Sequence, residues 1–88
     1  MVKWKLIYTK RVQEDAIKIK KTGLEAKAQK LLQIISQNPY QIPPSFEKLV
    51  SLEDTYSRRI NIQHRLVYQI DKENHLVIIK MLYKHYGQ

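Results

Sequence analysis

The chain has 88 residues and a net charge of +8, from 16 Lys and Arg against 8 Asp and Glu. Its length allows one domain with a modest core, and its 43% hydrophobic content excludes a disordered chain. The absence of cysteine excludes disulfides and thiolate metal sites, and it fits a reducing cytoplasm. The positive charge favours a polyanionic partner such as RNA, DNA, a membrane surface or an acidic protein, although it can also serve solubility alone.

The chain begins with a predicted strand and a predicted helix. Residues 3–8 alternate apolar side chains with lysines, as one face of a strand requires. Residues 10–22 carry apolar residues at helical spacing and predict an amphipathic helix, with Thr9 as its N-cap. The apolar positions of that helix are Val12, Ala16 and Ile19.

A second helix is predicted to follow the first after a short connection at Gly23, which is a good helix stop. Its apolar stripe consists of Leu24, Ala28, Leu31 and Ile35. Asn38-Pro39 ends this helix, because proline disfavours helix in the residue before it. The two helices therefore form a predicted αα-hairpin.

The second half of the chain predicts strands. Residues 56–61 and 65–70 are strand-like, and residues 75–83 form the strongest strand pattern, rich in Val and Ile. Residues 71–74 (DKEN) are predicted to form a turn. Residues 47–52 are ambiguous, because their sequence is compatible with a loop or with a short edge strand. The longest apolar stretch in this half is too short to span a bilayer, so we expect no membrane association.

The predicted order is β-α-α-β-β-β in a single domain spanning residues 1–88. This is an α+β fold, with two N-terminal helices packed on one face of a small, mainly antiparallel sheet. The other face of the sheet is then left open to solvent or to a ligand. Because side chains alternate along a strand, Leu66, Tyr68 and Ile70 are expected to face the helices, which places Arg65 on the open face.

Arginines interrupt the apolar pattern of residues 56–70. Arg58 and Arg59 point to opposite sides of their strand, and we expect Arg59 to join Arg65 on the open face. A guanidinium there can hold a phosphate through two parallel hydrogen bonds. The competing interpretation is that each arginine pairs with a nearby acid such as Glu53 or Asp54, which is the commoner outcome for a single arginine.

The segment YSRRINIQHRLVYQI (residues 56–70), with PPSFEKL (43–49) and KHY (84–86), resembles the YoeB/Txe branch of the RelE-type toxins of bacterial toxin–antitoxin systems. The resemblance begins at residues 5–8 (KLIY) and covers nearly the whole chain. It implies a cytoplasmic toxin that enters the ribosomal A site and cuts mRNA there, as a ribosome-dependent endoribonuclease or mRNA interferase. It also implies a cognate acidic antitoxin of the YefM/Axe kind, whose disordered segment wraps over the toxin, and a homodimer is expected.

The resemblance assigns the catalytic glutamate to Glu47 and the phosphate-binding arginine to Arg65, with Arg59 as the second arginine. The family's C-terminal His-Tyr pair falls on His85 and Tyr86. These residue types suit cleavage by the internal 2′-hydroxyl. Glu47 would remove its proton, the two arginines would neutralise the phosphorane, and His85 would protonate the leaving 5′-oxygen. Tyr86 would stack on a base or orient the phosphate. No metal or other cofactor is required.

Each of these roles has a simpler alternative. Glu47 could be an ordinary surface carboxylate, and His85, near a chain end, a solvated histidine. His64 is interpreted as structural, shaping the hairpin before Arg65. There is also a geometric difficulty: if the turn pairs Ile70 with residue 75, Arg65 lies opposite Lys80, and His85 is then about 16 Å away along an extended strand.

The chain departs from the family pattern in two places. Ile62-Gln63 stands where relatives often carry glutamates, and Gly87-Gln88 extends the chain beyond the His-Tyr pair. Two other functions compete with the nuclease. One is a non-catalytic toxin of the same superfamily that binds a protein such as gyrase, although relatives of that kind lack the Glu, Arg and His set. The other is a basic RNA-binding module without toxicity.

Overall fold

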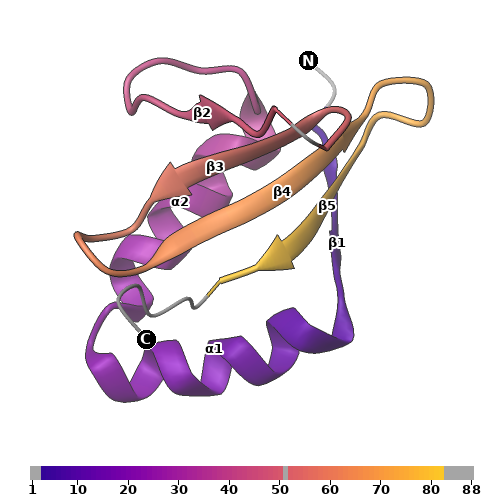
Figure 1. Ribbon diagram of the computed structural model, residues 1–88. Helices are drawn as coiled ribbons and strands as arrows, with labels where there is room; N and C mark the ends of the chain where they lie inside the picture. Colours follow the sequence, from indigo (N-terminus) through magenta and orange to yellow (C-terminus); the bar gives the residue numbers. More distant parts are fainter. Residues whose placement is uncertain (1–2, 51, 83–88) are drawn as a thin grey trace.

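The computed structural model describes residues 3–50 and 52–82 (Figure 1). Along the chain the elements are β1 (Lys5–Tyr8), α1 (Lys10–Thr22), α2 (Glu25–Gln37), β2 (Glu47–Lys48), β3 (Thr55–Arg59), β4 (Arg65–Asp71) and β5 (Leu76–Met81). The predicted α+β class is confirmed. The ambiguous segment 47–52 contributes β2, a two-residue edge strand that precedes the predicted three-strand meander.

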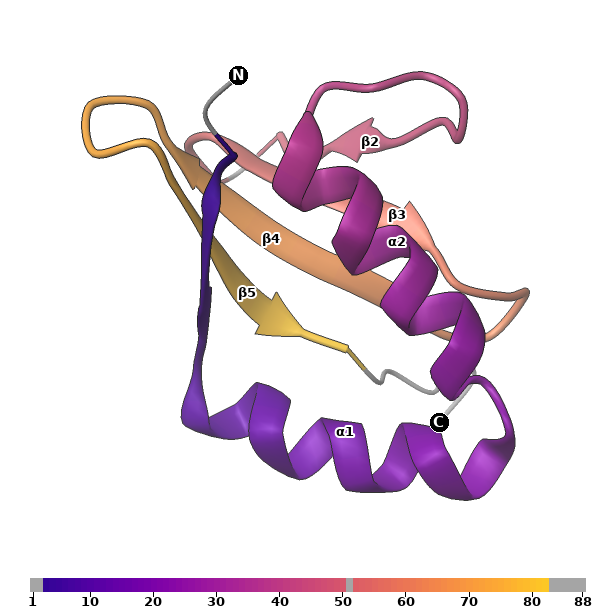
Figure 2. The same cartoon turned by 180° about the vertical axis from the view of Figure 1, so that it is seen from behind.

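The five strands form one mixed sheet in the order β1-β5-β4-β3-β2. The pairs from β2 to β5 are antiparallel, and β1 pairs in parallel with β5. Seen from behind in Figure 2, α2 lies across the sheet, while α1 lies beside β5. None of the helices in the described part of the chain is long and apolar enough to cross a membrane.

The core lies between the helices and the sheet face that they cover. From the helices it takes Val12, Ile19, Ala28, Leu31 and Ile35. From the strands and their ends it takes Tyr56, Ile60, Leu66, Tyr68, Ile70, Val77, Ile79 and Leu82. Burial of these apolar side chains is the main force that holds the helices on the sheet.

Helix α1 begins and ends as the sequence predicts. The Oγ1 of Thr9 accepts a hydrogen bond from the backbone N–H of Val12 (3.3 Å), and the same hydroxyl donates to the carbonyl of Ile79 in β5 (3.0 Å). Gly23 closes the helix in the left-handed conformation, at a φ of 78° that glycine adopts without a steric penalty.

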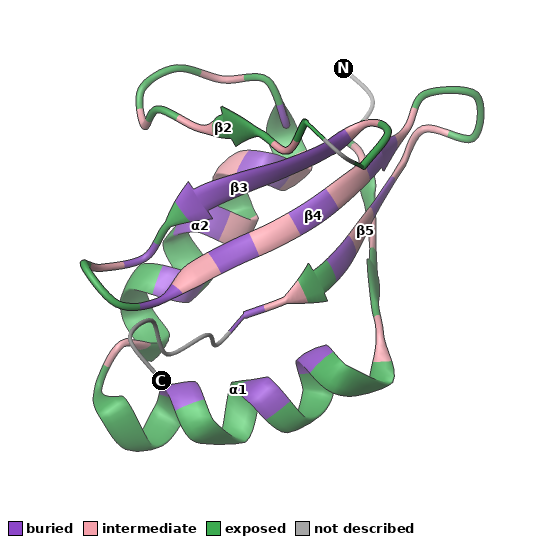
Figure 3. Ribbon diagram, in the orientation of Figure 1, coloured by how far each residue is buried: buried purple, intermediate pink, exposed green. Residues whose placement is uncertain are grey.

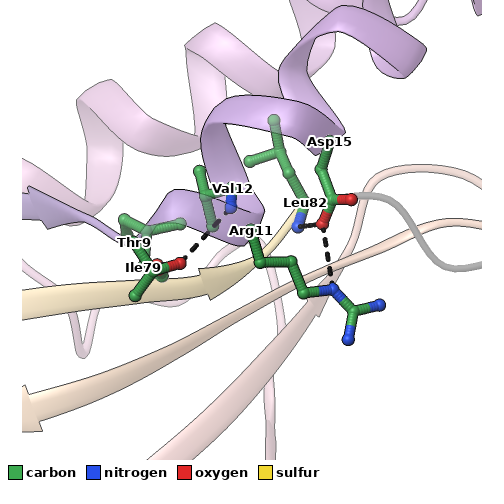
Figure 4. Close-up of polar contacts among 6 residues, drawn as sticks. All are labelled: Thr9, Arg11, Val12, Asp15, Ile79 and Leu82. Carbon is green, nitrogen blue, oxygen red and sulfur yellow. Dashed lines mark hydrogen bonds and ion pairs between the residues drawn. The ribbon is translucent and has the colours of Figure 1, made fainter.

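The buried face of α1 differs from the predicted one. Ala16 is exposed, and Asp15 is buried in its place between Val12 and Ile19. Asp15 is buried because its Oδ2 accepts a hydrogen bond from the backbone N–H of Leu82 (3.2 Å) and lies 3.4 Å from Nε of Arg11 (Figure 4). The carboxylate thus connects the end of β5 to α1. The spacing of apolar residues in the sequence cannot reveal this role.

The pairing of β4 with β5 also differs from the expected one. Ile70 lies opposite Val77, not opposite residue 75, and the register changes between Tyr68 and Val67, which lies opposite Met81. The expected pairing of Arg65 with Lys80 is therefore wrong, because the four-residue turn lies one position later, at residues 72–75, and the register changes again between Val67 and Tyr68.

Candidate RNA-cleavage site

The open face of the sheet is set by alternation along β4. Leu66, Tyr68 and Ile70 are buried against the helices, whereas the residues between them are only half-buried, and Figure 3 shows this as bands along the strand. Arg65 therefore begins β4 on the side away from the helices, as predicted.

Two arginines lie next to each other on this open face. Arg59 is the direct cross-strand partner of Arg65, whereas Arg58 is paired with Leu66 and points into the core. As the alternation predicted, Arg59 and not Arg58 accompanies Arg65. Two like charges directly opposite each other in a sheet repel, so an anion bound between them would be favoured.

Glu47 completes the group. Its Oε1 lies 3.0 Å from Nη2 of Arg65, and Nη1 of Arg65 donates a hydrogen bond to Oγ of Ser57 (3.2 Å). Glu47 reaches this position because β2 pairs with β3, which places Glu47 opposite Ser57. The glutamate side chain is 66% exposed, so this ion pair contributes little to folding.

A hollow of about 230 Å³ joins these side chains. Its lining consists of Ser45, Phe46, Glu47, Ser57, Arg59 and Arg65. It combines one carboxylate, two guanidiniums and two hydroxyls within a small volume. The guanidiniums can hold an anionic phosphodiester, and a carboxylate beside a bound phosphodiester can accept a proton from a neighbouring hydroxyl.

A second hollow, of about 290 Å³, adjoins the first through Arg59, which lines both. The other lining residues of the second hollow are Lys27, Lys30, Leu31, Ile34, Pro44 and Ile60. Lys27 and Lys30 are exposed on α2, and none of the described residues that line this hollow carries a carboxylate. Positive charge therefore continues from the open sheet face to α2. Nothing in the periodicity of the sequence indicated this extension.

The turn between the two arginines is held by local hydrogen bonds. Oδ1 of Asn61 accepts from the backbone N–H groups of Gln63 (2.9 Å) and His64 (2.7 Å), and the His64 carbonyl accepts from Ile60 (2.9 Å). His64 is buried, with 3% of its surface exposed. This placement agrees with its interpretation as a residue that shapes the hairpin.

The structure thus brings together three of the five predicted site residues, Glu47, Arg59 and Arg65. His85 and Tyr86 lie outside the described residues. Arg65 forms an ion pair with Glu47, an acid that the competing interpretation did not name. Ser57 was not predicted as part of the site, although its alternation with Arg59 along β3 could have indicated it. Among the residues that the structure describes, no group of three or more His, Asp or Glu side chains could hold a metal ion.

Comparison with known proteins identifies a family for this chain. Residues 8–86 match the family described as YoeB-like toxin of bacterial type II toxin–antitoxin system. A chain of the YoeB–YefM complex from Staphylococcus aureus is 30% identical, with a TM-score of 0.76 over 94% of this chain and 98% of that chain. None of the curated proteins matches the chain.

Two further solved structures share the fold. The YoeB/ParE toxin from Agrobacterium tumefaciens is 24% identical, with a TM-score of 0.81 over 93% of this chain and 99% of that chain. A chain of the intact RelBE toxin–antitoxin complex from E. coli is 24% identical, with a TM-score of 0.75 over 92% of this chain and 95% of that chain. Since the family match spans almost the whole chain, this protein belongs to the YoeB-like toxins of bacterial type II toxin–antitoxin systems.

Proposed function

We propose that this toxin is a ribosome-dependent endoribonuclease, an mRNA interferase that inhibits translation by cutting mRNA in the ribosomal A site. The observation that carries the proposal is the contact between Glu47 and Arg65, beside Arg59, on the open face of the sheet. Cleavage by an internal 2′-hydroxyl requires a base and groups that bind the phosphate, and residues of both kinds line one small hollow.

In the proposed step, Arg59 and Arg65 bind the two non-bridging oxygens of the scissile phosphate. Binding of the phosphate by Arg65 turns its guanidinium away from Glu47, whose carboxylate is then able to take the proton of the 2′-hydroxyl. The 2′-oxygen forms a bond to phosphorus as the bond to the 5′-oxygen breaks. His85 donates a proton to that leaving oxygen, and Tyr86 orients the phosphate or stacks on a base. The products are a 2′,3′-cyclic phosphate and a 5′-hydroxyl.

Primer extension on toxin-treated mRNA tests this proposal. The mRNA is treated once as bare RNA and once bound to ribosomes. We expect new 5′-hydroxyl ends within the A-site codon of the ribosome-bound message, and end analysis of the upstream fragment should find a 2′,3′-cyclic phosphate. A 2′-deoxy nucleotide at the cleaved position should abolish the cut. Cleavage of bare RNA as fast as ribosome-bound mRNA would overturn the ribosome dependence, and cleavage of the 2′-deoxy message would overturn the mechanism.

The proposal includes a cognate acidic antitoxin, similar to YefM or Axe, that controls the toxin in the cytoplasm. Its support is the family assignment together with the solved YoeB–YefM complex of the Staphylococcus aureus relative. An acidic segment of the antitoxin would lie over Arg65 and displace the C-terminal residues. A structure of the complex in which Arg65 stays exposed would contradict this part of the proposal.

A homodimer of the toxin is also proposed, and a YoeB dimer from Staphylococcus aureus with 29% identity is a precedent for it. Sedimentation equilibrium of the purified toxin measures this directly. A mass of twice 10.6 kDa is expected, and a monomer at all accessible concentrations would contradict the dimer.

A further inference from the structure

Arg58 is a charged residue placed entirely inside the protein. None of its surface is exposed, and it lies on the face of β3 that packs toward the helices. Burying a guanidinium is costly unless its donors are satisfied by good hydrogen bonds. The bonds that Arg58 makes therefore indicate what the residue does.

All three donor atoms of the guanidinium are used, and each has a neutral partner. Nε donates to Oη of Tyr68 (2.9 Å), Nη1 to the carbonyl of Pro44 (2.7 Å) and Nη2 to the carbonyl of Pro39 (3.0 Å). The Tyr68 hydroxyl in turn donates to the same Pro39 carbonyl (3.0 Å). Among the described residues, no carboxylate pairs with Arg58.

Two of these partners belong to one segment, residues 39–46, which connects α2 to β2. The segment contains Pro39, Pro43 and Pro44, which have no backbone N–H, so it makes few backbone hydrogen bonds of its own. Arg58 binds one carbonyl at its beginning and another near its end. The planar fork of a single guanidinium thus fixes the distance between the two ends of the segment.

The same side chain also sets the direction of the residues that enter β2. The Arg58 guanidinium carbon lies 4.8 Å from the centroid of the Phe46 ring, which also packs edge-on against Tyr56 at 5.4 Å. Phe46 therefore points inward. Since side chains alternate in an extended chain, the next residue, Glu47, points outward, where it meets Arg65.

From this geometry we propose that Arg58 is a positioning residue for RNA cleavage, which holds residues 39–46 so that Glu47 lies beside the scissile phosphate. This inference rests on the proposed function. Strand β2 has only two residues and cannot fix Glu47 alone. By contrast, Arg59 and Arg65 belong to strands joined by five paired positions, so their placement does not depend on the 39–46 segment. Loss of Arg58 should therefore impair the chemical step and leave RNA binding intact.

The test compares Arg58→Lys with the matched variant Arg11→Lys, which makes the same change on the exposed side of α1. Lysine keeps the charge but cannot reproduce the three-way fork. Three readouts are needed: hydrogen exchange of the amides in residues 40–48, the Kd for a single-stranded RNA oligonucleotide, and the single-turnover cleavage rate on ribosome-bound mRNA. We expect faster exchange in residues 40–48 only, a Kd within about twofold of wild type, and a rate roughly 10²-fold lower, the loss typical of a 1 Å misplacement.

A double-mutant cycle separates positioning from general destabilisation. In the Glu47→Gln background, adding Arg58→Lys should cause no further loss of rate, because its effect acts through Glu47. The inference is overturned if exchange in residues 40–48 is unchanged, if exchange rises equally throughout the chain, or if the two substitutions reduce the rate independently. Failure of the wild-type toxin to cleave RNA overturns the proposed function instead, and the exchange experiment still decides whether Arg58 holds the segment.

Discussion

Nη2 of Arg65 lies 3.0 Å from Oε1 of Glu47, although the two residues are 18 positions apart in the chain and belong to different strands. A phosphate held by Arg65 would therefore lie next to the one carboxylate among the described residues that line this hollow. This contact is the basis of the proposed mechanism.

Replacing Arg65 by lysine should impair cleavage more than replacing Arg59 by lysine. Arg65 contacts both Glu47 and Ser57, and its planar fork can bind two phosphate oxygens, which an ammonium cannot reproduce. We expect the rate constant of cleavage to fall by about 10²–10³ for Arg65→Lys, the usual effect of losing one group that stabilises developing charge. Single-turnover kinetics on ribosome-bound mRNA measure it, with Arg11→Lys as the control. Equal effects at Arg59 and Arg65 would contradict the special position of Arg65.

The lysines on α2 should contribute to RNA affinity without affecting the chemical step. Lys27 and Lys30 share a hollow with Arg59, so they can bind phosphates next to the cleaved one. The double variant Lys27→Gln/Lys30→Gln should reduce the slope of log K against log salt by about 1.4, since each single-strand phosphate contact contributes about 0.7.

The matched control for that experiment is Lys20→Gln/Lys21→Gln, which removes two exposed charges from the last turn of α1. Fluorescence anisotropy of a labelled single-stranded RNA at several salt concentrations gives both slopes. If the control changes the slope as much as the α2 variant does, binding depends on net charge alone, and the predicted track along α2 is wrong.

The stability of the protein should fall in alkali because of Tyr68. Burial raises the pKa of Tyr68 above its ordinary value of 10.0, and the nearby Arg58 opposes that rise. The folded state therefore holds the phenolic proton more tightly than the unfolded state. Its stabilising effect is complete below pH 10 and is lost as the pH rises through the pKa of the folded state, with a maximum slope of about 1.4 kcal/mol per pH unit for one proton.

Urea unfolding at a series of pH values from 9 to 12 measures that slope, and Tyr68→Phe should reduce it. The phenylalanine variant also loses the hydrogen bonds of the hydroxyl, so it should be less stable than wild type at neutral pH. An identical decline of both proteins above pH 10 would show that Tyr68 is not responsible.

The buried carboxylate of Asp15 should matter for stability. Asp15→Ala leaves the backbone N–H of Leu82 without its acceptor in a buried position, which costs about 1–3 kcal/mol. The neighbouring exposed residue provides the control, Glu14→Ala, which should change the free energy of unfolding by less than about 0.5 kcal/mol. Equal stability of the two variants in thermal unfolding would mean that the contact with Leu82 is not important.

Alternation and periodicity were sufficient to predict the framework of the fold and part of the site. The two-residue period of β4 placed Arg65 and Leu66 on different faces of the sheet, and that of β3 did the same for Arg59 and Arg58. Both deductions hold because a one-residue change of register would expose an entire apolar set, so the buried face fixes the orientation of each strand.

Other features depend on contacts between distant segments, which periodicity does not report. Asp15 is buried because Leu82, 67 residues later, supplies a donor. The pairing of β4 with β5 was mistaken because the turn and the irregularity beyond Tyr68 change the register. Arg58 donates hydrogen bonds to the carbonyls of Pro39 and Pro44. Every residue has a backbone carbonyl, so the sequence does not show which carbonyls accept these bonds. The resemblance to a toxin family, not periodicity, singled out Glu47.

The role of Glu47 as the base is tested most directly by the single-turnover rate of mRNA cleavage on the ribosome by Glu47→Gln, compared with wild type and with Glu53→Gln in the neighbouring loop. Glutamine keeps the shape of the side chain but cannot accept the 2′-hydroxyl proton. We expect a rate about 10²–10⁴-fold below wild type for Glu47→Gln, with unchanged RNA affinity, and a wild-type rate for Glu53→Gln. A wild-type rate for Glu47→Gln would show that the carboxylate beside Arg65 has no part in the reaction.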